Sequence, residues 1–338
     1  MPIRSTALRA AVLLPLVTAL SACAATTPTP TPTTAPGTDT PSAAPPAGPV
    51  TATDLTGRAV TVEKPAERVV CLDGSCIDAL AELGLEPVAS VQFDQVTSPL
   101  FFGPGVSTVA LGGTFFEPDL EGVIAAEPDL VIGSGGVHAE IENALGGIPL
   151  YLNKLATPEA AVTNLRNIAE LTGRQEQAET AIERYETTLA AYQPGSRPLS
   201  ALSMYGGATD DIGIDALDSA TGRIIAQYTD YPWPGANEGD SGFLEIGIET
   251  ILEQDPDYVW VLDFGFDPSA PPLLDQLAAE PLWKQLTAVK EGRVYAADAA
   301  WWGTTSGTRG QQGVLDTVLP TMYPEEFPRP LSGLTLGR

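Results

Sequence analysis

Two stretches of the chain, 128 positions apart, carry the same pattern. Residues 120–131 read LEGVIAAEPDLV and residues 248–259 read IETILEQDPDYV, so a glutamate, a proline and an aspartate recur at one offset. Each stretch predicts a helix with an acid in its first turn, where the helix dipole favours negative charge, followed by a Pro-Asp turn and an apolar strand. Ordinary helix-to-strand connections could account for either copy alone. The shared offset indicates two lobes built on one plan.

Short apolar strands alternate with helices on both sides of these stretches. In the first half of the chain the expected strands are residues 69–72, 87–91, 109–111, 130–132 and 150–152. In the second half the expected strands are residues 199–205, 258–262 and 293–296, and the expected helices lie around 215–227, 248–253 and 310–319. Strands and helices that take turns along a chain predict a parallel, Rossmann-like sheet covered by helices.

Helical periodicity fills the segment from 158 to 192, which separates the two halves. Gly173 is its one break, and the part from 174 to 192 would form a rod of about 28 Å. The predicted fold class is therefore α/β, with two Rossmann-like lobes joined by a single long backbone helix. We expect an N-terminal lobe at 51–173, the backbone helix at 174–193 and a C-terminal lobe at 194–338.

The first residues differ in composition from the lobes. Two arginines precede an apolar run at 10–19, and LSAC at 20–23 resembles the lipobox of bacterial lipoproteins. The resemblance implies that residues 1–22 are a signal peptide and that Cys23 is lipidated as the new N-terminus. The alternative is an ordinary secretory signal with an incidental cysteine.

Residues 23–50 are expected to be the lipidated cysteine and a tether. Positions 24–50 hold eight prolines, eight threonines and no aromatic residue, so they cannot bury enough apolar surface to fold. Extended like polyproline, they could reach roughly 80 Å. We therefore expect the lobes on the outer face of the cytoplasmic membrane, attached through the N-terminal lipid.

The composition excludes several classes of function. The formal net charge of −26 argues against a nucleic-acid binder, because neutralising phosphates needs clustered cations. One histidine and three cysteines are too few for a His- or Cys-rich metal cage. The chain also has neither a phosphate-binding Gly-Lys-Ser/Thr loop nor a Gly-x-Ser-x-Gly elbow. We expect no catalytic residue, no resident metal and no cofactor.

Four motifs occur in the same order as in class III substrate-binding proteins, which deliver iron-siderophores and cobalamin to ABC importers. They are RVVCL at 68–72 with ALAELG at 79–84, the stretch 120–132, LTGR at 171–174, and PLW at 281–283 with AVKEGRVY at 288–295. The chain resembles this family from about residue 60 to residue 319. The resemblance implies a ligand cleft between the lobes, a small closing motion, and one exposed glutamate per lobe that pairs with arginines of a permease dimer. Carried onto this chain, the docking residues are Glu121 and Glu249.

The candidate ligand-binding residues lie in loops, because ligands of open α/β sheets bind at the carboxyl ends of the strands. Trp302 and Trp233 are the strongest candidates, since they lie beside a glycine or a proline instead of inside a periodic apolar run. The other candidates come from the same group of loops: Trp301, Tyr205, Phe115, Phe116, Ser75, Gln92, Tyr231 and Arg309. For each aromatic residue, packing in the core or at the rim is at least as frequent an outcome.

Four residues have roles that the sequence leaves open. Arg309 could pair with an anionic ligand group or be a solvated surface arginine. His138 could ligate haem iron or a metal, although a loop histidine after two glycines is more often exposed or at a helix N-terminus. Cys71 and Cys76 could form a disulfide in an oxidising compartment or remain buried thiols.

The sequence therefore predicts a monomeric, lipid-anchored receptor that captures a ferric siderophore and presents it to an ABC permease dimer. The alternatives are a cobalamin or haem receptor of the same fold, or a cell-surface binding protein without a role in transport. An acidic surface repels anions over about 8 Å at physiological salt. The charge thus favours a hydroxamate-like or mixed siderophore over ferric citrate or a tri-catecholate.

Overall fold

The computed structural model describes residues 48–154, 157–195, 197–236, 243–263, 270–303 and 307–334. These residues belong to one compact unit that runs from Pro45 to Arg338. Cys23, the signal peptide and the tether up to residue 47 lie outside the described residues, so lipidation stays a prediction. Within the described residues no helix is both long enough and apolar enough to cross a membrane.

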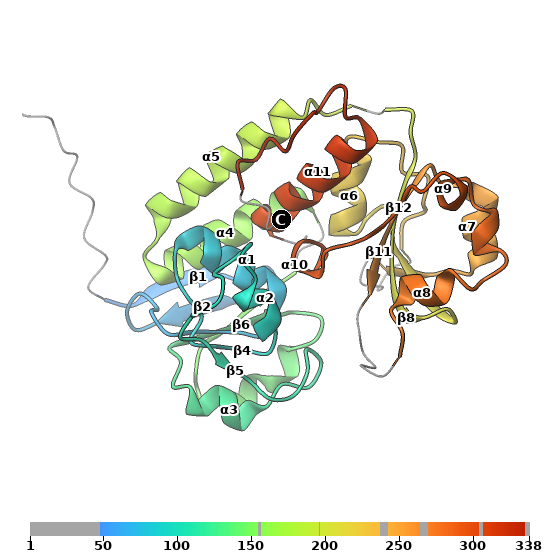
Figure 1. Ribbon diagram of the computed structural model, residues 1–338. Coiled ribbons are helices and arrows are strands. Elements are labelled where there is room, and N and C mark those ends of the chain that lie inside the picture. Colours follow the sequence, from blue (N-terminus) through green and yellow to red (C-terminus); the bar gives the residue numbers. More distant parts are fainter. Residues whose placement is uncertain are drawn as a thin grey trace, which may run out of the picture. The chain divides into compact units, whose positions relative to one another are not determined.

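The N-terminal lobe is built on a five-stranded parallel sheet (Figure 1). In spatial order its strands are β5 (Val109–Ala110), β4 (Ala89–Ser90), β3 (Val69–Cys71), β6 (Leu130–Ser134) and β7 (Leu150–Asn153). The five expected strands are confirmed. The central strands β3 and β6 are buried along nearly their whole length, which explains their unbroken apolar sequences.

Helices cover both faces of this sheet. They are α1 (Gly74–Leu83), α2 (Phe93–Thr97), α3 (Leu120–Ala125) and the 3₁₀ helix η1 (Ala139–Leu145). Neighbouring residues of β3 enter different cores, because side chains alternate along a strand. Val69 and Cys71 join the apolar cluster that includes Leu80 of α1, whereas Val70 joins the cluster that includes Val123 of α3.

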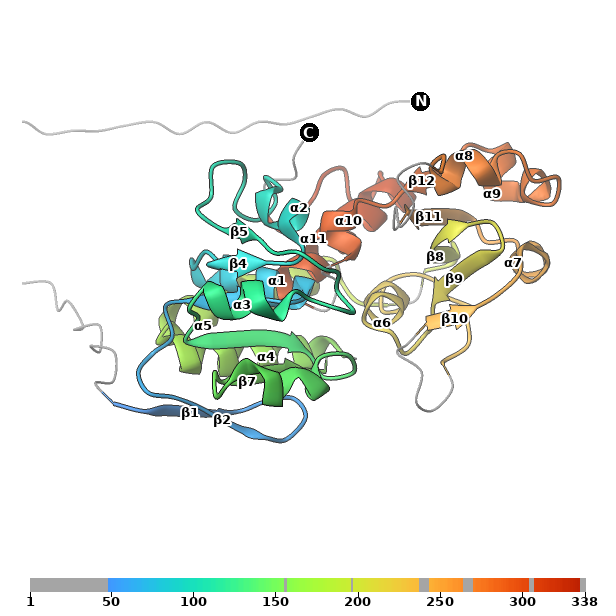
Figure 2. The ribbon, with the colours of Figure 1, turned by 90° about the horizontal axis from the view of Figure 1, so that it is seen from below.

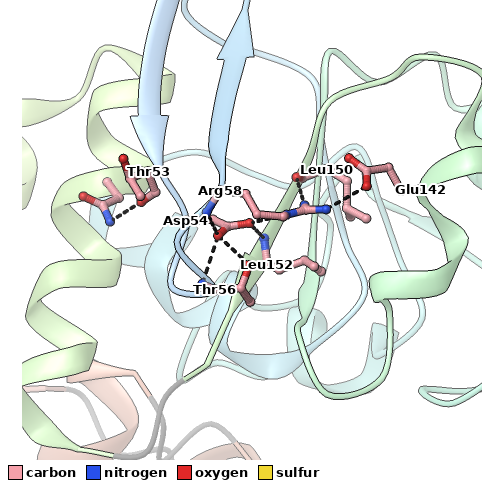
Figure 3. A network of polar contacts seen from close by, with 8 residues as sticks. Thr53, Asp54, Thr56, Arg58, Glu142, Leu150 and Leu152 are labelled. Carbon is pink, nitrogen blue, oxygen red and sulfur yellow. Dashed lines mark hydrogen bonds and ion pairs between the residues drawn. The ribbon is translucent and has the colours of Figure 1, made fainter.

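A hairpin of β1 (Val50–Thr53) and β2 (Ala59–Val62) begins the folded lobe and lies beside β7 in Figure 2. Asp54 holds its turn: Oδ1 accepts hydrogen bonds from the backbone N–H groups of Thr56 and Arg58, both at 2.9 Å. The Arg58 guanidinium then reaches the Leu150 carbonyl at 3.0 Å and Glu142 at 2.7 Å (Figure 3). The hairpin is thus fastened to β7 and η1 through one buried aspartate and one arginine.

The C-terminal lobe has a mixed sheet, where a parallel one was expected. Its order is β10 (Phe243–Glu245), β9 (Asp211–Asp215), β8 (Ala201–Ala208), β11 (Tyr258–Asp263) and β12 (Val294–Ala296). Strands β8, β11 and β12 run parallel, but β9 is antiparallel to both of its neighbours. The helix expected at 215–227 is therefore wrong at its start. The alternation of Ile212 and Ile214 with smaller residues forms β9, and α6 (Ala220–Ala226) begins after the Ser219 cap.

Two long helices follow the first lobe along the chain. Thr157 caps α4 (Pro158–Thr172), and Gly173 ends it in the left-handed conformation, with φ of 66°. The expected backbone helix is α5 (Gln175–Ala191), whose 17 residues span about 25 Å. The last helix, α11 (Thr308–Met322), packs against α1, α4 and α5. The exact lobe boundaries remain predictions.

Short helices complete the C-terminal lobe. They are α7 (Ile248–Gln254), α8 (Leu273–Leu277), η2 (Trp283–Gln285), α9 (Thr287–Lys290) and α10 (Ala299–Trp302). The core of this lobe is centred on Trp260 of β11 and includes Tyr228 and Leu315, all fully buried. Two α/β lobes, each with its own sheet and core, agree with the predicted fold class.

Candidate ligand-binding site

The order of strands in the N-terminal sheet reverses between β3 and β6. The chain moves outward from β3 through β4 to β5 and then returns to place β6 on the other side of β3. Ligands of open α/β sheets bind outside the carboxyl ends of the strands at such a reversal. This edge carries Ser75 in the first turn of α1, and Gln92, Phe115 and His138 in or beside the loops after β4, β5 and β6. The first lobe thus brings four sequence-selected residues to one edge of its sheet.

A disulfide and a helix cap fix the loop between β3 and α1. Cys71 and Cys76 are bonded, with their Cα atoms 5.4 Å apart, which answers the question that the sequence left open. Asp73 caps α1 through a hydrogen bond that Oδ1 accepts from the Cys76 N–H at 2.9 Å. Ser75 Oγ donates to the same oxygen at 2.8 Å, and Asn153 donates to Oδ2 at 2.6 Å. The Ser75 hydroxyl is therefore directed into the protein, and its contact with a ligand stays a prediction.

Gln92 follows β4 and is half-buried at the same edge. Its backbone N–H donates to Ser90 Oγ at 3.1 Å, but its side-chain Oε1 is buried and has no hydrogen-bond partner among the described residues. An unpaired buried acceptor costs free energy, on the order of 1 to 3 kcal/mol. Because this oxygen is itself buried, a ligand would meet it only after the side chain turns, so ligand contact by Gln92 stays a prediction.

The loop between β5 and α3 presents two phenylalanines. The Phe115 and Phe116 rings meet edge to face, with centroids 5.0 Å apart, and Phe116 is 65% exposed. The loop is closed by a bridge between Gly113 and Pro118 and by the Thr114 N–H, which donates to the Glu117 carbonyl at 2.9 Å. An ordered loop that leaves a large aromatic ring in solvent provides a surface on which an apolar or flat ligand can pack.

His138 is fully buried, which corrects the expectation that it is exposed. It does precede η1 as the N-cap residue, but its ring turns inward. Nδ1 accepts a hydrogen bond from the Ser134 N–H at 2.9 Å, and Nε2 lies 2.7 Å from the Phe115 carbonyl oxygen. Both ring nitrogens are occupied by the protein's own backbone, so His138 does not fit as an axial ligand to haem iron.

The candidate tryptophans of the C-terminal lobe lie in its core. Trp233 is 3% exposed, and its Nε1–H donates to the Ala201 carbonyl at 2.8 Å. Trp302 is 5% exposed; its Nε1–H donates to Ser203 Oγ at 3.0 Å, and its ring stacks on Trp260 with centroids 6.5 Å apart. The indole donors of both residues are used inside the protein, and ligand contact by them stays a prediction.

Trp301 faces a different part of the core from its neighbour. Its ring lies against Gly313 of α11 so closely that a Cβ atom at position 313 would be 2.1 Å from it. The ring also meets Phe101 of the first lobe, with centroids 5.9 Å apart. In addition, Gln95 of α2 donates to the Ala299 carbonyl of α10 at 3.3 Å. α2, which follows Gln92, therefore touches α10, which contains Trp301 and Trp302.

The two candidate tyrosines surround a buried aspartate that sequence reasoning missed. Tyr231 is buried and donates to the Asp215 carbonyl at 2.7 Å, and the half-buried Tyr205 ring covers Gly213 of β9. Asp215 accepts hydrogen bonds from Ser203 at 2.7 Å and Ser219 at 3.2 Å. Burial raises the pKa of Asp215 to about 6, although these bonds oppose the rise. The available signal was the aspartate four residues before the Ser219 helix cap.

Arg309 lies at the contact between α1 and α11, so of its two expected roles the solvated surface arginine does not hold. Its side chain is 17% exposed, and Nε donates to the Leu100 carbonyl at 2.7 Å. Its guanidinium is 3.7 Å from the buried Glu82 carboxylate, which also pairs with Arg184. Pairing with an anionic ligand stays a prediction, but the structure shows the guanidinium already engaged.

Asp78 of α1 caps the N-terminus of α11, which has no cap of its own. Its carboxylate accepts hydrogen bonds from the backbone N–H groups of Arg309 at 3.2 Å and Gly310 at 2.6 Å. Burial, and next the negative charge of Glu82, raise the pKa of Asp78 to about 7. Sequence reasoning missed this residue, although an aspartate and a glutamate four positions apart inside an apolar helix were the signal.

The predicted docking glutamates have matching positions in the two lobes. Glu121 lies in the first turn of α3 and Glu249 in the first turn of α7, and both side chains are exposed. Asp119 caps α3 through hydrogen bonds from the N–H groups of Glu121 and Gly122. The duplicated helix-turn-strand plan is therefore present, whereas the docking role is not tested by the structure.

Metal-binding groups and cavities elsewhere in the described residues do not indicate a second ligand site. These residues hold no group of three or more His, Cys, Asp or Glu side chains that could bind a metal ion. Two open cavities, of about 320 and 360 Å³, lie along α5 between Glu82 and Ser332. Neither cavity is lined by a candidate ligand residue.

Comparison with known proteins agrees with this architecture. The model of the family described as Periplasmic binding protein matches residues 69–300, which is more than half of the chain. The chain belongs to this family of extracytoplasmic binding proteins.

Three individual relatives illustrate the range of similarity. The Fe(3+)-citrate-binding protein YfmC of Bacillus subtilis (strain 168) is 24% identical over 270 residues, covering 78% of this chain and 83% of that protein. The Fe(3+) dicitrate-binding periplasmic protein FecB of Escherichia coli (strain K12) is 25% identical over 268 residues, covering 76% and 86%. The solved structure of the petrobactin-binding protein YclQ from Bacillus subtilis has a TM-score of 0.64 at 19% identity, covering 81% and 99%, and supports the fold.

Proposed function

We propose that this protein captures a ferric siderophore complex outside the cytoplasm and delivers it to an ABC importer. The observation that carries the proposal is the family match over residues 69–300, because it spans both sheets and the long helices between them. Relatives named for ferric citrate add support for an iron complex as the cargo. Membership of a binding-protein family also argues against an enzyme.

The carboxyl edge of the N-terminal sheet is the part of the molecule best suited to hold the ligand. Phe116 offers an exposed ring, Phe115 supports it, and Gln92 lies half-buried at the same edge. Burying a fully exposed phenylalanine ring contributes about 1.5 to 3 kcal/mol. We therefore assign the first ligand contacts to these three residues, ahead of Trp233 and Trp302.

An iron complex of a small chelator is favoured over haem. Haem binding by a protein commonly uses a side chain on the iron, and the single histidine of this chain has both nitrogens engaged. A ferric siderophore brings its own oxygen ligands and needs no metal ligand from the protein. Cobalamin likewise carries its own metal, so it remains the second candidate.

The observations point in different directions on whether the ligand is anionic, neutral or cationic. Relatives named for ferric citrate favour an anionic complex. The described arginines favour a neutral or cationic ligand, because six of them are held in ion pairs with the protein's own carboxylates: Arg58, Arg166, Arg184, Arg197, Arg293 and Arg309. With a net charge of −26 and few free cations, we keep a neutral or cationic ferric hydroxamate, or a mixed siderophore, as the proposed class.

A titration with a panel of ligands tests the proposal. The panel contains a ferric trihydroxamate, ferric dicitrate, a ferric tri-catecholate, cyanocobalamin and haemin, and the readout is quenching of tryptophan fluorescence confirmed by calorimetry. We expect saturable binding of the trihydroxamate at submicromolar concentration. Tight binding of the anionic complexes alone would overturn the charge argument, and tight binding of cobalamin or haemin alone would overturn the ferric siderophore itself.

For delivery, Glu121 and Glu249 would contact the two halves of a permease dimer. Two like charges fixed at equivalent positions of two lobes can match a partner with two-fold symmetry. The simpler reading is that each acid only complements its helix dipole, which is worth about 0.3 to 1 kcal/mol. Replacing both by alanine should abolish uptake but leave folding and ligand affinity nearly intact. Glu253→Ala, at another exposed position of α7, serves as the control. Normal uptake by the double variant at wild-type abundance would leave only the dipole role.

The proposed anchor is the lipid on Cys23. Replacing this cysteine by serine should release the protein from the membrane while ligand affinity is unchanged, since the site lies in the folded lobes. Fractionation of cells and immunoblotting measure the release. Retention of the serine variant in the membrane would contradict lipidation at this residue.

A further inference from the structure

The single histidine of the chain forms a bridge between two loops of the ligand edge. His138 stands just after β6, and the Phe115 carbonyl that it meets belongs to the loop after β5. Strands β5 and β6 are not neighbours in the sheet, since β4 and β3 lie between them. His138 therefore joins backbone segments whose strands do not touch.

The backbone partners of His138 fix the position of its proton. A backbone N–H can only donate, so Nδ1 must accept from Ser134 and cannot carry a hydrogen. A carbonyl oxygen can only accept, so Nε2 must carry the hydrogen that points at Phe115. The two backbone partners thus select one tautomer, in which Nδ1 accepts and Nε2 donates.

The packing around His138 leaves the ring in one orientation. The His138 imidazole lies against Gly133, where a Cβ atom would be 2.7 Å from Nδ1, and the backbone N–H of His138 donates to the Ser134 carbonyl at 2.7 Å. The Phe115 ring meets the imidazole edge to face at 5.2 Å and meets Phe116 at 5.0 Å. A rigid histidine therefore supports a row of three rings, and the outermost of them is 65% exposed.

We propose that His138 is a positioning residue that holds the Phe115–Phe116 loop in its binding geometry before the ligand arrives. The inference rests on the proposed function, because it assigns the loop to the ligand site. Its physical basis is preorganisation: a loop that is already ordered does not lose conformational entropy on binding. The bond from Nε2 to the Phe115 carbonyl carries this role, whereas the bond at Nδ1 orients the ring.

Two substitutions separate the tasks of the two nitrogens. In His138→Gln the amide nitrogen can occupy the place of Nε2 and still donate to the Phe115 carbonyl. In His138→Asn the shorter side chain can accept from the Ser134 N–H as Nδ1 does, but it does not reach Phe115. Both variants replace a buried ring by an amide, so they serve as matched controls for the loss of packing.

The first readout is hydrogen exchange of the full chain without ligand. We expect the asparagine variant to exchange the amides of residues 112–119 at least tenfold faster than wild type. The glutamine variant should stay within threefold, and peptides of β11 should be unchanged in both. Equal exchange of 112–119 in wild type and the asparagine variant, or equal acceleration in both variants, would overturn the proposal.

The second readout is the affinity for ferrioxamine B, a ferric trihydroxamate, and for ferric dicitrate. Loss of one hydrogen bond that preorganises the loop should weaken binding about fivefold in the asparagine variant, with rescue by glutamine. An unchanged affinity despite a loosened loop would contradict the positioning role. If wild type binds neither complex, the proposed cargo fails, while the exchange experiment still decides whether His138 holds the loop.

Discussion

Aromatic residues of the connecting segments have opposite roles in the two lobes. In the N-terminal lobe the loop after β5 exposes Phe116, whose ring is 65% accessible to solvent. In the C-terminal lobe Trp233 and Trp302 are almost fully buried, and their indole N–H groups are bonded to the neighbouring strand β8. The same local pattern, an aromatic residue beside glycine or proline, was used to select candidates in both lobes. In one lobe it selected an exposed ring, and in the other it selected rings of the core.

The difference follows from the elements that carry these residues. Phe116 lies in the loop between β5 and α3, which leaves the edge of the parallel sheet. In the other lobe Trp302 is the last residue of the short helix α10, and Trp233 contacts the first residue of β8, at the amino end of that strand. Trp302 then covers Trp260 and Ser203, and Trp233 reaches back to Ala201, so these aromatic residues complete the core.

Among the substitutions that test this difference between the lobes, removal of a buried tryptophan should have the largest effect on stability. We expect Trp233→Ala to lower the free energy of unfolding by about 3 to 5 kcal/mol, because it removes a large buried ring and one hydrogen bond. Urea unfolding followed by circular dichroism measures the change. A loss below 1 kcal/mol together with a large loss of ligand affinity would mean that Trp233 belongs to the ligand surface.

Two buried aspartates of the N-terminal lobe should respond to pH with opposite signs. For Asp54 burial alone would raise the pKa, but hydrogen bonds from Arg58 and Thr56 together lower it below its usual value. Its stabilisation is therefore present above the unfolded pKa near 3.8 and is lost as the pH falls through the lower folded value. For Asp78 the pKa is raised to about 7, so the protein gains stability as the pH falls from about 7 towards 4.

The Asp78 effect can be measured as the pH dependence of unfolding. Wild type should gain up to about 4 kcal/mol between pH 8 and pH 4 from this group. Asp78→Asn should flatten this rise in stability. Asp54→Asn should not change the rise, but it should reduce the loss of stability below pH 4. A rise of equal size in wild type and the Asp78→Asn variant would show that another group is responsible.

A smaller effect is expected from the indole of Trp302. Trp302→Phe keeps an aromatic ring against Trp260 but removes the donor to Ser203, whose hydroxyl still donates to Asp215. We expect a loss of about 1 kcal/mol in the free energy of unfolding, the usual net value of one hydrogen bond. Affinity for the ferric trihydroxamate should change less than twofold. A large drop in affinity with unchanged stability would place Trp302 among the ligand contacts.

The smallest effect on stability should come from Phe116. Because its ring is 65% exposed, Phe116→Ala should change the free energy of unfolding by less than about 0.5 kcal/mol. Its effect on binding should be larger, with a loss of about tenfold in affinity for the ferric trihydroxamate. Ile124→Ala, at a position that is also exposed, is the control for an apolar side chain on the same lobe. Equal affinities of wild type and the Phe116 variant would remove this ring from the site.

Patterns within the sequence predicted the first lobe better than the second. Apolar runs and glycine caps located β3, β6, α4 and α5, because burial and capping act over a few residues. The antiparallel strand β9 was missed, since two isoleucines at alternate positions are too short an alternation to identify a strand. The inward turn of His138 and the capping of α11 by Asp78 depend on contacts across 23 and more than 200 positions. No local pattern encodes such contacts.

The central claim is that the protein holds a ferric complex, and native mass spectrometry tests it most directly. The full mature protein would be purified in mild detergent from iron-limited cells of its host and sprayed without denaturation. We predict an added mass that carries the isotope pattern of one iron atom and disappears on reduction and chelation. Protein that carries cobalamin or haem, or that stays unliganded even after incubation with the ferric complexes, would contradict the account.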